Sequence, residues 1–323
     1  MTLLTVSDLV VEAAGQQIIR GLSLSVDAGE RVGLIGESGS GKTMAALALM
    51  GLLPEGLSLQ GSIELEGVEL TGLSDRRYSE IRGDRLAMIF QEPMTALDPL
   101  MRVGRQIRDA VRLHRRISRA EASSRMLQLL ARVGFRNPTE QARRFPHQLS
   151  GGQRQRVLIA IALACDPALI LADEPTTALD VTVQAQVLSL LQRLVREERS
   201  ALLLISHDLA VVSSVCDRVL VMYGGTVVES APTREILTAP RHPYTVALLD
   251  TSRGISADGE TAAGQLPTIP GAVPAWDQFP SGCVFRGRCP REQDRCREVP
   301  SLTEGEHRVA CWFPISSDRG GGS

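Results

Sequence analysis

The sequence predicts an α/β fold with a mixed, mostly parallel sheet, and two observations favour this class. Aromatic residues make up only 3% of the 323 residues. The core must therefore come from Leu, Val, Ile and Ala, which suit buried parallel strands and packed helices. Strand-like apolar runs also alternate with helical stretches from Met1 to about Glu229, as parallel βαβ units require. At this length we expect two units.

The individual elements follow from the apolar runs. Residues 32–36, 168–172 and 201–206 predict buried strands, whereas residues 42–50 and the amphipathic stretch 181–199 predict helices.

Residues from about 95 to 164 have a mostly helical pattern and are rich in Arg, which indicates a helical subdomain inserted into the sheet domain. Eight arginines lie between Arg102 and Arg125. A solvated helix face is the preferred interpretation, because helix surfaces commonly carry such charge, and a docking face for a partner is the alternative.

The character of the chain changes after about Leu249. Residues Ser252–Gln265 are small and polar and predict a linker, and residues 266–283 are rich in Pro and Gly and predict irregular structure. We therefore expect one domain over residues 1–250 and a linker with a small C-terminal domain over residues 251–323.

Composition excludes some classes of function. The formal net charge is -2, which argues against a broad nucleic-acid face, because phosphate binding needs an excess of Lys and Arg on one surface. No apolar run reaches the roughly 18 to 20 residues that span a bilayer, and the N-terminus lacks the pattern of a signal peptide. We expect a chain in the cytosol, or peripheral to the cytoplasmic face of the cell membrane.

Gly36–Thr43 spells GESGSGKT, a complete GxxxxGK[ST] phosphate loop between a predicted strand and a predicted helix. Gly36, Gly39 and Gly41 let the backbone curl so that N–H groups point inward, and the following helix adds partial positive charge. We expect Lys42 to reach the β- and γ-phosphates and the Thr43 hydroxyl to bind magnesium. The predicted nucleotide-binding residues here are Gly36, Glu37, Ser38, Gly39, Ser40, Gly41, Lys42 and Thr43.

A pair of carboxylates follows the predicted strand at residues 168–172. Asp173 is placed to hold magnesium, often through water, and Glu174 to polarise the attacking water. Acidic residues are common in loops, so the pair alone is weak evidence. The phosphate loop about 130 residues upstream makes it strong.

Between these two sites lies LSGGQ, at Leu149–Gln153. With this signature the chain resembles, over nearly its whole length, the ATP-binding subunits of ABC transporters. Further matches are Gln91 within IFQEPMTALDP, the D-loop TALD at Thr177–Asp180, and His207 within ISHDL. A lone histidine would more often be structural, but His207 follows a strand at the position that the family uses to contact the γ-phosphate.

The resemblance implies a set of roles for these residues. The fold would be a P-loop NTPase cassette with an N-terminal antiparallel β portion, and the activity would be ATP hydrolysis. The implied catalytic residues are Glu174, His207 and Gln91, and the implied magnesium ligands are Thr43, Gln91 and Asp173.

The resemblance also implies that two such subunits pair head to tail. Ser150 and the backbone around Gly151 and Gly152 would then open a helix against the γ-phosphate that the partner holds, and Gln153 and Asp180 would join the nucleotide-binding residues. One subunit would not complete a site alone.

The family usually places an aromatic residue about 23 positions before the phosphate loop, where it stacks on adenine. Ala13 occupies that position here, and no aromatic residue precedes Tyr78. The sequence therefore offers no aromatic residue at this position for the stacking, which is worth roughly 1 to 3 kcal/mol by analogy with base–aromatic contacts. Either plain apolar contact from Ile18 or Val11 replaces it, or nucleotide affinity is modest.

Within the family, the chain most resembles the oligopeptide and dipeptide importer branch. RHPYTVALL at Arg241–Leu249, then LPTIPGAVP and GCVFRGRCP, resemble the domain that this branch appends. The implied partners are a second, paralogous ABC ATPase subunit, two transmembrane permease subunits and an extracytoplasmic solute-binding protein, with no nucleic acid.

The transported solute stays open at this point. Peptides are the first expectation, and nickel chelates or glutathione are handled by similar machines. A soluble ABC ATPase of translation or DNA repair is a remote alternative, because it needs two fused cassettes or a long coiled coil. The chain has one phosphate loop and no long heptad stretch.

Four cysteines fall in the last 41 residues with the spacing C-x5-C-x6-C-x14-C: Cys283, Cys289, Cys296 and Cys311. Cytosolic redox conditions make disulfides unlikely for this set, and four thiolates suit zinc or an iron–sulfur cluster. The gaps exceed the usual C-x2-4-C of structural zinc sites. The family resemblance points to a [4Fe–4S] cluster ahead of zinc, with a metal-free fold as a third possibility. His307 is a candidate stray ligand, although a surface role is preferred.

Overall fold

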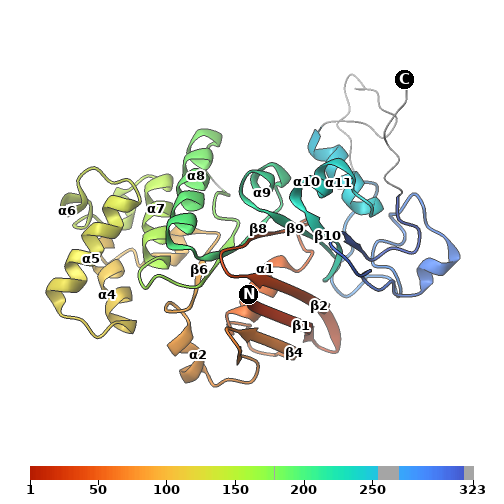
Figure 1. Cartoon of the computed structure of the whole chain (residues 1–323), viewed down its shortest axis with the longest axis horizontal. Coiled ribbons are helices and arrows are strands. Elements are labelled where there is room, and N and C mark those ends of the chain that lie inside the picture. The colour runs from red at the N-terminus through yellow and green to blue at the C-terminus, as the bar shows by residue number, and fades with distance from the viewer. Residues whose placement is uncertain (178, 254–268, 316–323) are drawn as a thin grey trace. The chain divides into compact units, whose positions relative to one another are not determined.

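Two β-sheets organise the computed structural model, which describes residues 1–177, 179–253 and 269–315 (Figure 1). Most of the predicted linker, and the last eight residues of the chain, lie outside this described part. The four-stranded sheet has the order β2-β1-β4-β5, formed by β1 (Thr2–Ala13), β2 (Gln16–Asp27), β4 (Leu57–Leu65) and β5 (Val68–Glu69). β4 runs antiparallel to both β1 and β5, so the expected N-terminal antiparallel β portion is confirmed.

The larger sheet has seven strands in the order β11-β10-β9-β3-β8-β7-β6. Its pairs include both parallel and antiparallel strands. Its members are β3 (Arg31–Ile35), β6 (Leu86–Ile89), β7 (Leu169–Asp173), β8 (Ala201–Ser206), β9 (Arg218–Tyr223), β10 (Thr226–Pro232) and β11 (Arg308–Val309). All residues of β7 and β8 are buried, which fits near-continuous apolar runs in the middle of a covered sheet. The three strands predicted from sequence are thus β3, β7 and β8.

The chain divides into two compact units. The first unit comprises Met1–Leu3, Val26–Glu30 and Gly72–Leu204, and the second comprises Leu4–Ser25, Arg31–Thr71 and Ile205–Ser323. Each is described separately below. Because this grouping rests on spatial contacts, it follows neither the order of the chain nor the boundary near residue 250, which remains a prediction.

In the first unit, β6 and β7 pair in parallel, from Leu86 opposite Leu169 to Ile89 opposite Ala172. Between these strands the chain forms only helices and loops, which confirms the predicted helical insertion. The helices of this unit are α2 (Asp75–Ile81), α3 (Pro93–Ala96), α4 (Val103–His114), α5 (Arg119–Arg132), α6 (Pro138–Gln141), α7 (Gly151–Ala162) and α8 (Val181–Glu198).

Helical spacing explains how the insertion packs. Val103, Ile107 and Val111 are buried along one face of α4, at the three- and four-residue intervals that bring side chains to one side of a helix. α4 contacts both α5 and α7. α5 begins with a capping box, in which the Ser118 side chain accepts from the Glu121 N–H and the Glu121 carboxylate accepts from the Ser118 N–H.

In the second unit, β3 pairs in parallel with β9, and β9 pairs antiparallel with β10. The helices here are α1 (Lys42–Leu49), α9 (Leu209–Val215), α10 (Thr233–Thr238) and α11 (Pro243–Arg253). A Cβ at Gly33 would lie 2.1 Å from Val212 Cγ1, so this glycine lets α9 pack directly on β3. Among the described residues, no helix is long and apolar enough to cross a membrane.

The C-terminal segment 269–315 is mostly irregular, and for residues 269–283 this agrees with the prediction from their Pro and Gly content. Its regular pieces are the short 3-10 turn Asp294–Arg297 and β11, which pairs antiparallel with β10. Phe285 is fully buried and lies 5.3 Å from Tyr223 and 5.4 Å from Tyr244, ring centre to ring centre. Phe285 thus packs the segment against aromatic side chains of β9 and α11.

Candidate functional site

The phosphate loop of the second unit has the backbone that its glycines require. Gly39 and Gly41 have φ of 80° and 99°, a left-handed conformation that favours glycine. A Cβ at Gly36 would lie 2.1 Å from the Met222 carbonyl oxygen, so only glycine fits where the loop leaves β3. The loop then enters α1 directly, with Gly41 at the N-cap.

Lys42, the only lysine in the sequence, lies within this loop. Its Nζ donates to the carbonyl oxygens of Gly36 and Glu37, at 2.8 and 2.9 Å, and contacts Ser40 Oγ at 3.3 Å. The ammonium group is thus held in the concave side of the loop, where a bound phosphate would meet it. The Thr43 side chain is exposed at the start of α1.

The first unit brings three other predicted residues together. Asp173 ends β7 and is 2% exposed, and Glu174 follows it with φ of 43°. The Glu174 Oε2 accepts a hydrogen bond from Gln91 Nε2 at 3.1 Å and another from Thr177 Oγ1 at 2.8 Å. A left-handed glutamate is uncommon, and here it turns the carboxylate toward Gln91.

The signature residues form a helix start in the same unit. Ser150 is the N-cap of α7, and its hydroxyl accepts from the Gln153 N–H while the Gln153 side chain accepts from the Ser150 N–H. A Cβ at Gly152 would lie 2.4 Å from Val183 Cγ1. Gly152 therefore allows α7 to pack closely against the start of α8.

The D-loop continues this arrangement into α8. Asp180 is the N-cap, and its Oδ1 accepts from the Val183 N–H at 2.9 Å. Leu179 Cδ2 lies 3.1 Å from the position of a Cβ on Gly151, so the D-loop and the signature are in contact. Ala178 lies outside the described residues.

His207 is exposed in the second unit, directly after β8 and before α9. Asp208 caps α9 and accepts from the N–H groups of Ala210 and Val211. The histidine thus lies between a buried strand and a capped helix.

Val11 and Ile18, the two apolar candidates for contact with adenine, differ in their exposure. Val11 is fully buried, so it offers no surface to a base, and the expectation for this residue is wrong. Ile18 is partly exposed, and its carbonyl oxygen lies 3.5 Å from the position of a Cβ on Gly41. Ile18 therefore remains beside the phosphate loop.

The four late cysteines gather around one small cavity, which His242, Phe285 and Trp312 also line. All four are free thiols. Burial, together with nearby cysteines, raises the pKa of Cys289 to about 11 and raises the pKa values of Cys283 and Cys311. Four sulfurs around one cavity fit a thiolate-bound group in donor type. Among the described residues, however, no three His, Cys, Asp or Glu side chains are close enough to form a metal-binding group.

The preference for His307 on the surface is wrong. Its side chain is 13% exposed, and it contacts Glu229 Oε1 at 2.7 Å and Glu235 Oε2 at 3.0 Å. Glu229 is fully buried and also accepts from the N–H groups of Arg241 and His242. His307 thus ties the C-terminal segment to β10 rather than joining the cysteines.

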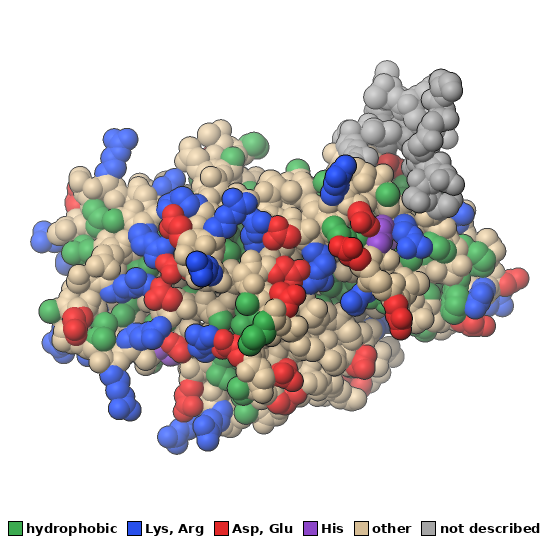
Figure 2. Space-filling model, in the orientation of Figure 1, with side chains coloured by type: hydrophobic (Ala, Val, Ile, Leu, Met, Phe, Trp, Pro, Cys, Tyr) green, Lys and Arg blue, Asp and Glu red, His purple; other side chains and the backbone are tan. Residues whose placement is uncertain are grey.

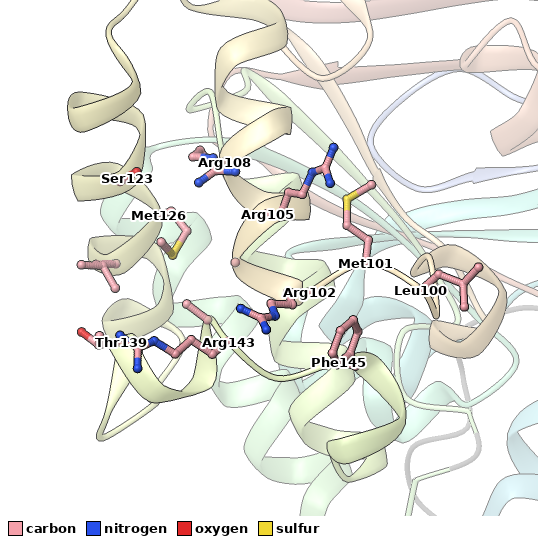
Figure 3. Close-up of a pocket in the computed structure, with 13 residues that line it drawn as sticks. Leu100, Met101, Arg102, Arg105, Arg108, Ser123, Met126, Thr139, Arg143 and Phe145 are labelled. Carbon is pink, nitrogen blue, oxygen red and sulfur yellow. The ribbon is translucent and has the colours of Figure 1, made fainter.

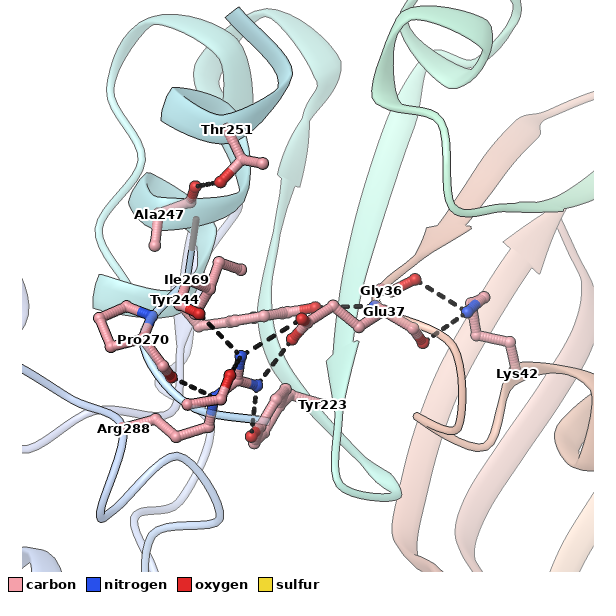
Figure 4. Close-up of polar contacts among 11 residues, drawn as sticks. Gly36, Glu37, Lys42, Tyr223, Tyr244, Ala247, Thr251, Ile269, Pro270 and Arg288 are labelled. Carbon is pink, nitrogen blue, oxygen red and sulfur yellow. Dashed lines mark hydrogen bonds and ion pairs between the residues drawn. The ribbon is translucent and has the colours of Figure 1, made fainter. Parts of the chain in front are cut away.

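Sequence reasoning did not identify Arg288, which contacts the phosphate loop. Its guanidinium donates to both carboxylate oxygens of Glu37, at 2.9 and 3.3 Å, and to Tyr223 Oη at 3.0 Å (Figure 4). The Glu37 N–H donates to Tyr244 Oη at 2.8 Å. In the sequence, the position of Arg288 beside Cys289 was only a weak indication of a functional role, because arginines are common throughout this chain.

Comparisons with known proteins agree with this geometry. The family model of the ABC transporter matches residues 19–177, and that of the oligopeptide/dipeptide transporter C-terminal region matches residues 228–296. The chain is 47% identical to the probable D,D-dipeptide transport ATP-binding protein DdpD of Escherichia coli K12, over 92% of this chain and 90% of that protein. It is 44% identical to the oligopeptide transport ATP-binding protein OppD of the same strain, over 92% and 88%.

Among solved structures, the dimeric ATP-binding cassette MJ0796 bound to ADP and Pi is similar, with a TM-score of 0.63 and 28% identity. That match covers 72% of this chain and 99% of the other. The phosphate loop, the Gln91–Glu174 pair, the capped signature helix and the extent of these matches lead to one conclusion: the chain belongs to the ATP-binding proteins of ABC transporters, in the branch that carries the oligopeptide/dipeptide transporter C-terminal region.

Proposed function

We propose that this chain binds and hydrolyses ATP to drive the import of peptides, or of related peptide-like solutes, across the cytoplasmic membrane. One observation carries the proposal: an ABC cassette and an oligopeptide/dipeptide transporter C-terminal region occur in the same chain. Relatives at 44% and 47% identity are named as oligopeptide and D,D-dipeptide transport proteins. The chain would work from the cytoplasmic face of that membrane.

In this proposal Glu174 is the general base. A base must be ionised and held within reach of the water that it polarises. The donors Gln91 and Thr177 stabilise the charged carboxylate and fix its Oε2. Gln91 thereby links the position of the base to α3, the short helix that follows Gln91 and Glu92.

The phosphate loop binds the nucleotide through its backbone N–H groups and Lys42. Mg²⁺, when bound, neutralises phosphate charge, and we assign Thr43, Asp173 and Gln91 as the residues that hold it. The exposed His207 contacts the γ-phosphate in this scheme. ATP and Mg²⁺ follow from membership of the family, whereas these residue assignments are proposals.

The signature helix serves a partner subunit. The capping box at Ser150 satisfies the first N–H groups of α7 and fixes the direction of its N-terminus, where the helix dipole favours a phosphate. Together with Gly151, Gly152, Gln153 and Asp180, this helix start would close over the nucleotide of a second ABC ATPase subunit, which we expect to be a paralogue.

The membrane subunits would dock on the helical insertion. A cavity of about 710 Å³ there is lined by the apolar side chains of Leu100, Met101 and Phe145 and by several arginines (Figure 3). Leu100 is 87% exposed, and the Arg102 guanidinium lies 5.7 Å from the Phe145 ring centre. A surface that combines apolar and basic groups suits an amphipathic helix with acidic residues.

The wider arginine face is largely solvated, as preferred from the sequence. Figure 2 shows arginines projecting around α4 and α5, with acidic side chains among them. Arg115 pairs with Asp84 at 3.7 Å, and Arg125 pairs with Asp166. Only the arginines that line the cavity are therefore assigned to partner docking. Two permease subunits and a solute-binding protein would complete the importer.

The four cysteines would hold a [4Fe–4S] cluster, with zinc as the alternative. Burial raises the thiol pKa values of Cys283, Cys289 and Cys311, so a metal must displace protons from these three residues to bind, and loading depends on pH. The cluster would stabilise a segment that is too small to fold on its core alone. Protein purified without oxygen should absorb near 400 nm and contain about four irons, and a colourless protein with one zinc would contradict the cluster.

The ATPase assignment is tested by Glu174→Gln in the full chain, with Glu55→Gln as a matched exposed control. Because only the water-polarising charge is lost, ATP should still bind while hydrolysis falls by at least about a hundredfold, the lower end for general-base catalysis. The control should hydrolyse ATP at the wild-type rate. Wild-type hydrolysis in Glu174→Gln would contradict the role of this residue as the base.

Lys42→Ala tests the nucleotide site independently. The variant should lose most of its affinity for MgATP, measured by competition with a fluorescent ATP analogue, because the loop loses its only fixed positive charge. Unchanged affinity would count against the phosphate-loop assignment. Uptake of labelled peptides by cells that carry the complete transporter then tests the solute class.

A further inference from the structure

Arg288 is almost buried, with a side chain that is 7% exposed, and it lies directly before Cys289. Every nitrogen of its guanidinium donates to an acceptor of the second unit. Besides Glu37 and Tyr223, the acceptors are the carbonyl oxygens of Pro270 at 2.8 Å and Gly271 at 3.1 Å. A buried charge is stable only when it is paired and hydrogen-bonded in this way.

Glu37 is the second residue of the phosphate loop, and three groups hold it (Figure 4). Its carboxylate accepts from Arg288, its N–H donates to Tyr244 Oη, and its carbonyl accepts from Lys42 Nζ. Burial raises the pKa of Tyr244, so this phenol stays protonated. Tyr244 and Arg288 make two of these three contacts, and both residues follow β10 in the sequence.

Glu37 also creates an electrostatic difficulty for the loop. A carboxylate beside a phosphate site repels the triphosphate, and the repulsion is strong where the surroundings are partly desolvated. The Glu37 side chain is 25% exposed, so water screens it only in part. The two-pronged contact with Arg288 neutralises this charge and fixes the direction in which the side chain points.

We infer that Arg288 is a positioning residue for the ATP site: it neutralises Glu37 and holds it aside, so that the phosphate loop can accept a triphosphate. The C-terminal segment is therefore part of the nucleotide-binding apparatus as well as an appendage. This inference rests on the proposed phosphate-binding role of Gly36–Thr43.

The test compares MgATP affinity in full-length variants, by competition with a fluorescent ATP analogue. Arg288→Ala leaves Glu37 unpaired and should weaken MgATP binding about tenfold, as expected for one uncompensated charge near the phosphates. Arg297→Ala is the matched control, because Arg297 lies in the same segment, also beside a cysteine, and is 75% exposed. This control should bind like the wild type.

A double variant distinguishes a positioning role of Arg288 from a merely structural one. Adding Glu37→Gln to Arg288→Ala removes the repelling charge, so the double variant should regain affinity to within about threefold of the wild type. If Arg288 only anchored the segment, removing its partner as well would not help. A double variant as weak as Arg288→Ala, or wild-type affinity in Arg288→Ala, would overturn the inference.

Two further measurements keep the outcome interpretable. Far-UV circular dichroism reports whether Arg288→Ala folds, and if it does not, Arg288→Gln carries the same comparison with less loss of packing. Lys42→Ala, measured alongside, tests the site itself. If Lys42→Ala loses ATP but Arg288→Ala does not, the proposed function stands and only the role of Arg288 fails.

Discussion

The structure predicts whether replacing Gly152 with alanine raises or lowers the stability of the protein. Gly152 lies in the first turn of α7, where an alanine would ordinarily stabilise a helix by roughly 0.5 to 1 kcal/mol relative to glycine. The added Cβ would lie 2.4 Å from Val183 Cγ1, closer than carbon atoms can approach. Gly152→Ala should therefore destabilise the protein, because either the valine or the helix must move.

The magnitude follows from two opposing contributions. Overpacking of this kind costs about 1 to 3 kcal/mol, and a valine has few alternative rotamers with which to escape. Subtracting the helix gain of roughly 0.5 to 1 kcal/mol leaves a net loss of up to about 2.5 kcal/mol in the free energy of unfolding. Hydrolysis should fall as well, since Gly152 belongs to the signature.

Urea unfolding followed by circular dichroism measures the loss of stability. The effect of Gly152→Ala is then measured again in a protein that also carries Val183→Ala. With the Cγ1 methyl removed, Gly152→Ala should be neutral or stabilising, which gives a coupling energy of about 1 to 3 kcal/mol between the two positions. Gly151→Ala is the matched control, because its Cβ would meet only the flexible end of Leu179, at 3.1 Å. A coupling energy near zero, or a Gly152→Ala variant more stable than the wild type, would refute the reasoning.

Two other predictions concern single contacts. Ser118→Ala removes the N-cap of α5 and its reciprocal bond with Glu121, and should lower the free energy of unfolding in urea by about 1 kcal/mol; an unchanged value would contradict the capping role. Burial raises the pKa of Glu69, but hydrogen bonds from Ser62, Thr71 and Ile63 outweigh it and lower that pKa to about 2. Because the folded value lies below the unfolded value near 4.3, this carboxylate stabilises the fold above pH 4.3 and loses the contribution as the pH falls toward 2. The Glu69→Gln variant should therefore show a shallower fall in stability across that range, and an identical fall would exclude the effect.

The local shapes of the phosphate loop and of the signature could be predicted from sequence, because each motif is short and lies at the end of one strand or the start of one helix. GESGSGKT needs only its own glycines and the adjoining α1 to take its shape. LSGGQ likewise encodes its own cap, with Ser150 and Gln153 three residues apart. Gln91 was identified only through the family resemblance, and its hydrogen bond to Glu174, 83 residues away, was not predicted.

The contacts of the C-terminal segment could not be predicted in this way. Glu37 and Arg288 lie 251 residues apart, and neither belongs to a periodic pattern that marks it as buried. The same holds for His307 and Glu229, whose pairing depends on β11 reaching β10. A Pro- and Gly-rich sequence indicates irregular backbone, but it does not show where that backbone docks.

The short strand β11 has a consequence for shortening the chain. Glu229 and Ser230 of β10 pair with Val309 and Arg308, and the Ala310 N–H donates to the Val228 carbonyl at 2.8 Å. A chain cut after α11 would leave these backbone groups of β10 as an open sheet edge, and unprotected edges recruit strands from other molecules. Such a cassette should aggregate more readily than the full chain, so the pairing of β11 with β10 protects solubility.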